Sequence, residues 1–258
     1  MQTAEHLEGL RTAAMAFARY ADRAGLDAPV PTCPGWSVRD LVAHQGDVHR
    51  WAVAHLRGRA DEHDREAGRR AGRSAPDPLQ WLRDGTVEFA RAVSDETPAG
   101  ARPLVFLAGA DPGRPREFWA RRQCHETTIH AVDALSAALG RFPTAAETWI
   151  DAAVARDGID ELLTGFLPQP RSRLRAEEAT RLVVRADDDD GSRGPGWLVE
   201  VSEQPPTTTR LDPSEGLPAY DVVLAGGSVE LYLTLWNRSD EHAGVGGDWD
   251  AWRAGMRV

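Results

Sequence analysis

Lysine is absent from the sequence, since all 30 basic residues are arginine. This absence excludes catalysis by a lysine nucleophile or by a lysine Schiff base. Acidic residues outnumber basic ones by 40 to 30, which gives a formal net charge of −10 at pH 7. A general nucleic-acid-binding protein needs a basic face for phosphates, so we expect no nucleic-acid partner.

Cysteine and several signature motifs are also scarce or missing. The two cysteines, Cys33 and Cys124, form no C-x-x-C pair, so a disulfide framework is not indicated. There is no G-x-G-x-x-G or P-loop pattern, which argues against a nucleotide site, and no G-x-S-x-G. Neither a secretory signal segment nor an apolar run of transmembrane length is present. We therefore expect a cytoplasmic protein without a membrane partner.

The most informative stretch is Arg122–Asp133, in which residues recurring at three- and four-residue steps predict a helix. Glu126 and His130 stand four residues apart, so their side chains project from one helix face, one turn apart. A carboxylate and an imidazole in this arrangement can hold one divalent cation, and Asp133 can then orient the His130 ring. The alternative is a solvated ion pair on a surface helix, which contributes only a few tenths of a kcal/mol.

Two ligands hold a metal poorly, and His44 is the candidate for the third. Apolar residues three positions before it and four after it place it on the core side of a helix predicted over residues 38–58. A histidine on an apolar flank is more often a hydrogen-bonded core residue, and the residues alone leave that alternative open. His49 and His55 lie well around the helix or three turns away, so neither can easily share a metal with His44.

Cys124 and His125 precede Glu126 directly but should point elsewhere. Successive residues of a helix are rotated by about 100°, so these two side chains stand about 100–200° away from Glu126. We expect neither to bind the metal.

Four helices account for the N-terminal half of the chain. Apolar periodicity and capping residues predict them over 3–25, over 38–58, after Asp77-Pro78, and over 116–139. Joined by long connections, they predict an antiparallel four-helix bundle. Residues 59–75, which are rich in Arg, Gly, Asp and Glu, are predicted to form a solvated loop.

The pattern changes after a boundary near Arg141–Pro143, which predicts a bundle over residues 1–142 and a second domain over 143–258. A helix is expected from Thr144 through Leu162, with Glu147 at the capping position. Alternating apolar residues then predict strands over 181–185, 197–201, 207–211 and 221–224, followed by a helix over 228–238. The second domain is therefore small and α+β, and so is the fold class of the whole chain.

Three segments resemble the mycothiol-dependent maleylpyruvate isomerase family. The segment from Cys33 to His44 resembles the start of its second helix, and the segment from His125 to Asp133 resembles its fourth-helix motif. The segment from Leu224 to Arg238 looks like the closing strand and helix of its C-terminal domain. Together these matches cover both predicted domains, and they imply a DinB-like helical bundle followed by an α+β domain.

The resemblance implies a divalent metal, usually zinc, held by His44, Glu126 and His130. Such a set leaves an open coordination position, as catalytic zinc requires, and a metal there can convert a bound thiol to its thiolate. In the family that thiol is mycothiol, which adds to an unsaturated acid and is eliminated again to give the isomer. The residue matching Arg238 is expected to contact the substrate carboxylate.

We therefore expect a metal- and mycothiol-dependent enzyme, a monomer or homodimer, that isomerises an unsaturated or electrophilic small acid or transfers a thiol to it. The substrate itself is not fixed by the sequence. One alternative is a non-catalytic metal-binding or ligand-sensing protein on the same bundle scaffold. Another is a structural bundle whose histidines are core residues.

Overall fold

The computed structural model describes residues 1–103, 114–187, 193–212, 214, 216–241, 244–246, 253 and 255. The chain divides into two compact units, of which the first comprises Met1–Leu104 and Pro112–Pro143 and the second includes Thr144–Val258. Each unit is described by itself below.

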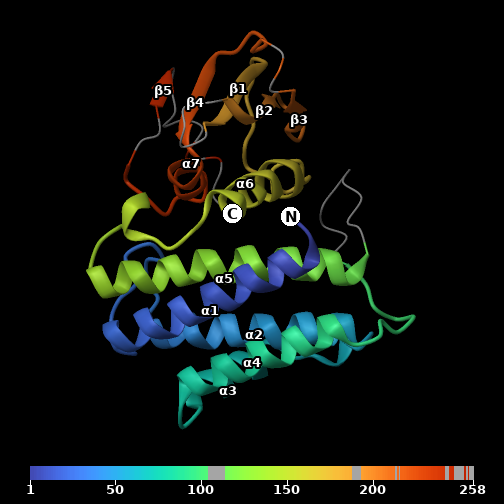
Figure 1. Cartoon of the computed structure of the whole chain (residues 1–258), viewed down its shortest axis with the longest axis vertical. Helices are drawn as coiled ribbons and strands as arrows, with labels where there is room; N and C mark the ends of the chain where they lie inside the picture. Colours follow the sequence, from blue (N-terminus) through green and yellow to red (C-terminus); the bar gives the residue numbers. More distant parts are fainter. Residues whose placement is uncertain are drawn as a thin grey trace. The chain divides into compact units, whose positions relative to one another are not determined.

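The N-terminal unit is helical. Its described helices are α1 (Thr3–Ala24), α2 (Val38–Leu56), the 3₁₀ turn η1 (Ala60–Glu62), α3 (Arg65–Ser74), α4 (Pro78–Ser94) and α5 (Pro115–Leu139). The long helices α1, α2, α4 and α5 run alongside one another, with α1 packed on α5 and α2 packed on both α4 and α5 (Figure 1). This arrangement confirms the predicted bundle and, together with the second unit, the α+β fold class.

The two helices that carry the candidate ligands have well-defined ends. Ser37 caps α2 by accepting a hydrogen bond from the Asp40 backbone amide, and Asp40 returns the contact, which completes a capping box. Pro115 opens α5, where its missing N–H costs nothing, and Gly140 ends that helix with a φ of 71°. Most of α5 is buried, so its polar residues lie within the bundle rather than on its surface.

The prediction of a solvated loop over 59–75 is wrong, because α3 lies there. Asp64 caps the helix by accepting from the amides of Glu66 and Ala67. An apolar stripe is the sequence signal by which the other helices were predicted. This helix has none, since only its Gly72 is buried. The helix instead approaches α2 closely, since a Cβ on Gly68 would collide with Asp47 Oδ1. Close backbone contact and ion pairs on Asp47 therefore replace hydrophobic burial.

The C-terminal unit is a five-stranded sheet in the order β3-β2-β1-β4-β5 among the described residues. The strands are β1 (Thr180–Asp187), β2 (Arg193–Val201), β3 (Thr207–Leu211), β4 (Val222–Gly227) and β5 (Gly244–Gly246). β1 pairs parallel with β4, and the other neighbours are antiparallel. Helices α6 (Ala152–Glu161) and α7 (Ser228–Leu235) pack on each other, and α7 contacts β1 and β4.

The continuous helix expected from Thr144 is interrupted. Thr144 and Glu147 do form a capping box, but the turn that follows is the 3₁₀ segment η2 (Ala145–Glu147). The α-helix starts afresh at Ala152, where Asp151 accepts from the Val154 amide, and it passes into the π-helical turn η3 (Leu162–Phe166). Among the described residues, no helix is long and apolar enough to cross a membrane.

Candidate metal centre

The structure brings His44, Glu126 and His130 together on the seam between α2 and α5. One ligand atom from each lies within 4.8 Å of the others. Glu126 Oε1 is 3.4 Å from His44 Nε2 and 3.4 Å from His130 Nε2. The three side chains are 18%, 23% and 13% exposed respectively, so the cluster is accessible but mostly shielded from water.

These distances fit a tetrahedral zinc ion better than direct hydrogen bonds. Two ligand atoms that each lie about 2.0–2.1 Å from zinc stand about 3.3–3.4 Å apart when they are tetrahedrally placed. The observed separations of 3.4 Å match this spacing but are long for charge-assisted hydrogen bonds. The donor set also leaves one tetrahedral position for a non-protein ligand. The residues present therefore fit a metal with an open site.

Arg122 holds the second oxygen of the Glu126 carboxylate. It lies one turn before Glu126 on α5, and its Nη2 donates to Glu126 Oε2 over 2.8 Å. Burial by itself would raise the pKa of Glu126, but the Arg122 charge and the two histidines hold that pKa well below its usual range. The carboxylate is therefore ionised, and it keeps Oε1 free to face the two imidazoles.

Asp133 orients the His130 ring, as its spacing indicated. His130 Nδ1 lies 2.8 Å from Asp133 Oδ2, which leaves Nε2 to point at Glu126. Burial lowers the pKa of His130, but the Asp133 and Glu126 carboxylates outweigh it and raise the pKa to about 9. Asp133 is itself buried and accepts from Thr32 Oγ1 (2.6 Å) and Cys33 Sγ (3.3 Å). The turn before α2 thus supports a candidate ligand on α5.

Trp36 forms a wall beside both imidazoles. Its ring lies edge-on to His44, with centroids 5.1 Å apart, and is stacked with His130 at 6.4 Å. Burial lowers the pKa of His44, although Glu126 acts in the opposite direction. His44 is therefore the more easily deprotonated of the two candidate histidine ligands.

Four other described histidines and the second cysteine lie apart from this cluster. His49 is buried in a network in which its Nε2 lies 3.0 Å from Thr127 Oγ1, while burial lowers its pKa to about 3. His55 packs its ring on Trp119. His125 is buried with its ring 6.1 Å from that of His6, and Cys124 is buried as well.

Sequence reasoning placed Arg122 on the right helix face but assigned it no role. It also did not connect Thr32 or Trp36 to the site. The signal for Arg122 was available, because an arginine four residues before a glutamate on a helix can pair with it. The contacts from the turn depend on tertiary packing, and nothing in the local sequence reports them.

Arg238, the predicted substrate contact, belongs to the C-terminal unit. It follows α7, and its Nη1 donates to the Trp236 carbonyl over 2.8 Å. Asn237 just before it has a φ of 57°, a conformation that asparagine tolerates better than most residues. The role of Arg238 toward a substrate stays a prediction.

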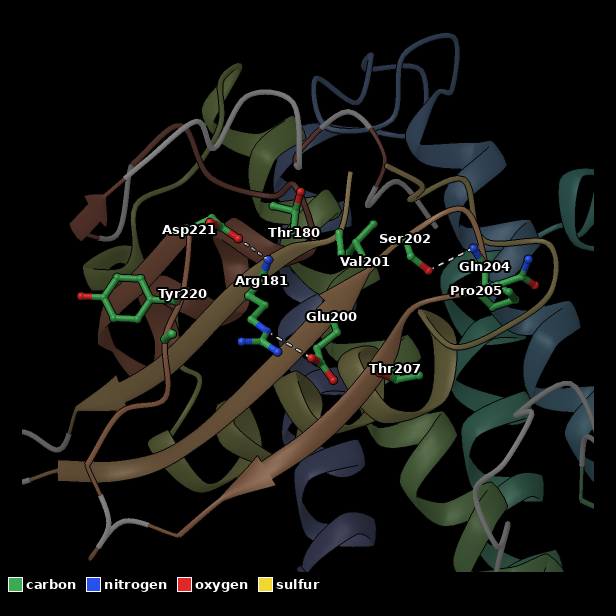
Figure 2. Close-up of a pocket in the computed structure, with 12 residues that line it drawn as sticks. Thr180, Arg181, Glu200, Val201, Ser202, Gln204, Pro205, Thr207, Tyr220 and Asp221 are labelled. Carbon is green, nitrogen blue, oxygen red and sulfur yellow. Dashed lines mark hydrogen bonds and ion pairs between the residues drawn. The ribbon is translucent and has the colours of Figure 1, made fainter. Parts of the chain in front are cut away.

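Each unit also carries a cavity that the metal cluster does not use. The larger, about 830 Å³, is an apolar groove between α1 and α4. The other, about 510 Å³, lies on the sheet of the C-terminal unit (Figure 2). Its arginine, Arg181, is paired with Glu200 over 3.2 Å, and the Arg181 amide donates to Asp221. The positive charge of Arg181 is thus already balanced within the pocket.

Comparisons with known proteins agree with this fold. The family profile described as the mycothiol maleylpyruvate isomerase N-terminal domain matches residues 7–135, and the profile of the C-terminal domain of the same family matches residues 153–254. The chain belongs to the mycothiol maleylpyruvate isomerase family. The resemblance seen in its motifs is thereby confirmed, and so, at the level of the family, is the expectation of an enzyme.

Two solved structures of the mycothiol-dependent maleylpyruvate isomerase show the same fold. One, at 16% sequence identity, covers 95% of this chain and 93% of its own chain, with a TM-score of 0.58. The other, a histidine-to-alanine mutant, has 17% identity, the same coverage and a TM-score of 0.57. At such identity the likeness extends to the fold alone. No curated protein sequence matches the chain.

Proposed function

We propose that the protein is a metal- and mycothiol-dependent enzyme that isomerises an unsaturated small acid or transfers the thiol to an electrophilic one. His44, Glu126 and His130 hold the metal, most suitably zinc. Membership of the mycothiol maleylpyruvate isomerase family supports thiol-dependent isomerisation as the general chemistry. The observation that carries the proposal is the 3.4 Å spacing from one Glu126 oxygen to both histidine nitrogens, which suits tetrahedral zinc.

Zinc bound at this site would lower the pKa of a coordinated thiol and so supply a thiolate at neutral pH. Lysine, which could otherwise take the thiol proton, is absent from the chain. The only described cysteine near the cluster, Cys33, already donates to Asp133. The metal is therefore the natural activator.

The surrounding side chains keep the three ligands ready. Asp133 accepts from Nδ1 of His130, which favours the tautomer whose Nε2 lone pair faces the site. Arg122 neutralises part of the Glu126 charge through Oε2 and fixes the orientation of Oε1. Trp36 covers one side of both imidazoles and limits the access of water there. We propose that Arg238 binds the substrate carboxylate, a role that suits a guanidinium.

Calorimetry with mycothiol tests the proposal. The zinc-loaded protein should bind mycothiol and release a proton, so the affinity should rise with pH through the apparent pKa of the bound thiol. The metal-free protein, and a Glu126→Gln variant that lacks metal, should not bind it. Equal affinity of the zinc-loaded and metal-free forms would rule out a metal-bound thiolate.

A turnover assay distinguishes the proposed enzyme from the alternative of a non-catalytic ligand-sensing protein. Zinc-loaded protein with mycothiol should isomerise maleylpyruvate or conjugate an electrophilic acid, as followed by the loss of the substrate. Metal-dependent thiol binding without any turnover across such a panel of acids would favour the ligand-sensing protein on the same scaffold.

A further inference from the structure

A second polar cluster lies on α2, one turn from the metal ligands. Asp47, three residues after His44, is completely buried, and it is surrounded by three basic side chains from the following segment. His63 Nε2 lies 2.8 Å from its Oδ1, and Arg65 Nε donates to its Oδ2 over 2.8 Å. Arg69 Nε approaches the same oxygen to 3.8 Å. Two guanidinium groups thus face one carboxylate.

Arg65 is held rigidly at two places. Besides the hydrogen bond from its Nε to Asp47, its guanidinium carbon lies 4.3 Å from the centroid of the Trp51 ring, a cation–π contact. The side chain remains 30% exposed. Among the residues that the structure describes, no hydrogen-bond partner meets its Nη1 or Nη2. The outer edge of a fixed guanidinium is therefore available, and its two parallel N–H groups match a carboxylate.

The position of Arg65 relates it to the metal cluster. Trp51 lies seven residues after His44, almost two full turns, so it stands on the same face of α2 about 10 Å further along the axis. Trp51 also contacts Trp119 of α5 edge-on at 5.4 Å, and Trp119 lies seven residues before Glu126. The aromatic pair thus continues the seam that holds the metal ligands.

We propose that Arg65, fixed by Asp47 and Trp51, is a carboxylate-binding residue that receives the acid group of the electrophile next to the metal centre. The ligand class is a short-chain organic acid that reaches from the metal-bound thiol to the guanidinium. The assignment rests on the proposed function, because it orients the substrate relative to that thiol. It is a second carboxylate contact, in addition to the one predicted for Arg238, which belongs to the other unit.

A purely structural role explains only part of the arrangement. The Asp47 cluster does anchor α3 to α2, as the close approach of Gly68 shows. That anchoring uses Arg65 Nε, together with His63 and Arg69. It makes no use of Nη1 and Nη2, and an anchor alone does not need the stack on Trp51. The proposal accounts for both features.

The test uses adipate, a saturated dicarboxylate that cannot react with the thiol, and its neutral diamide. Calorimetry compares the wild type with Arg65→Gln and Arg65→Lys, each in zinc-loaded and metal-free form. Arg65→Gln should weaken adipate binding about tenfold to a hundredfold in both forms, since it removes hydrogen bonds to a charged group. Arg65→Lys keeps the charge but loses the fork, so its affinity should fall in between. Binding of the diamide should not depend on residue 65.

Arg70→Gln is the matched control. Arg70 is also on α3 but is 60% exposed and pairs with Glu66, so its loss removes the same charge without touching the site. Its adipate affinity should equal that of the wild type. Equal adipate affinity of the wild type and Arg65→Gln, no adipate binding by the wild type, or an equal loss for the diamide would each overturn the proposal. Zinc-loaded Arg65→Gln should bind mycothiol with the same affinity as the zinc-loaded wild type. Mycothiol binding therefore tests the metal–thiolate proposal independently of the Arg65 proposal.

Discussion

Replacing Asp133 by asparagine should weaken zinc binding without removing any of the three proposed ligands. Asp133 accepts hydrogen bonds from Thr32, from Cys33 and from His130 Nδ1. Asparagine has nearly the same shape but only one acceptor oxygen. Either Thr32 or His130 must then face an amide NH₂, and the His130 ring loses its negatively charged partner. Loss of such a partner behind a metal ligand costs about 10- to 100-fold in affinity, or about 1.4–2.8 kcal/mol.

A competition titration against a zinc-binding dye measures this change directly. Asp22→Asn, on the exposed side of α1, is the control for the loss of one negative charge. In the metal-free protein, a histidine-selective NMR titration should also show the His130 pKa falling from about 9, because Asp133 helps to raise it. Zinc affinity of Asp133→Asn equal to that of the control would refute the role assigned to Asp133.

Four further expectations follow from the same structure. His44→Ala should lose most of its zinc under mild chelation, as measured by metal analysis, whereas stoichiometric retention would show that the ligand set is wrong. Cys124→Ser should keep full zinc content and turnover, since Cys124 is buried outside the cluster; sulfur coordination by Cys124 in an absorption spectrum would contradict this. Arg238→Gln should reduce turnover of an acidic substrate but leave zinc content unchanged, and equal turnover would remove its proposed role. His49 has a pKa of about 3 when folded and about 6.5 when unfolded, so the unfolded chain binds the extra proton between these values. The free energy of unfolding should therefore decrease as the pH is lowered below about 6.5. This group contributes up to about 1.4 kcal/mol per pH unit to the decrease. When urea unfolding is measured at several pH values, the free energy of unfolding of His49→Gln should depend less steeply on pH than that of the wild type. An unchanged pH dependence would contradict the assignment.

The clustering of the three candidate metal ligands could be anticipated because their arrangement depends on helix periodicity. Glu126 and His130 share a face of α5 by spacing alone, and Asp133 follows at the next turn. The choice of His44 over His49 also followed from helix geometry. His49 is indeed turned into a buried network with Thr127 and Gln45.

The features that the sequence did not reveal depend on packing between distant segments. The turn containing Thr32 meets Asp133 across 101 residues of chain, and no local pattern encodes that contact. The helix α3 lacks an apolar stripe because it packs through glycines and through the ion pairs on Asp47. Hydrophobic periodicity cannot detect a helix of this kind. The short strand β5 was missed as well, since its three residues Gly244–Gly246 carry little strand propensity.

The most direct test of the account is the zinc X-ray absorption spectrum of the loaded protein before and after the addition of mycothiol. Before the addition, the spectrum should show only nitrogen and oxygen neighbours at about 2.0–2.1 Å, contributed by His44, Glu126, His130 and water. After it, one sulfur neighbour should appear at about 2.3 Å. A spectrum that stays free of sulfur at saturating mycothiol would contradict the claim that the metal binds the thiolate.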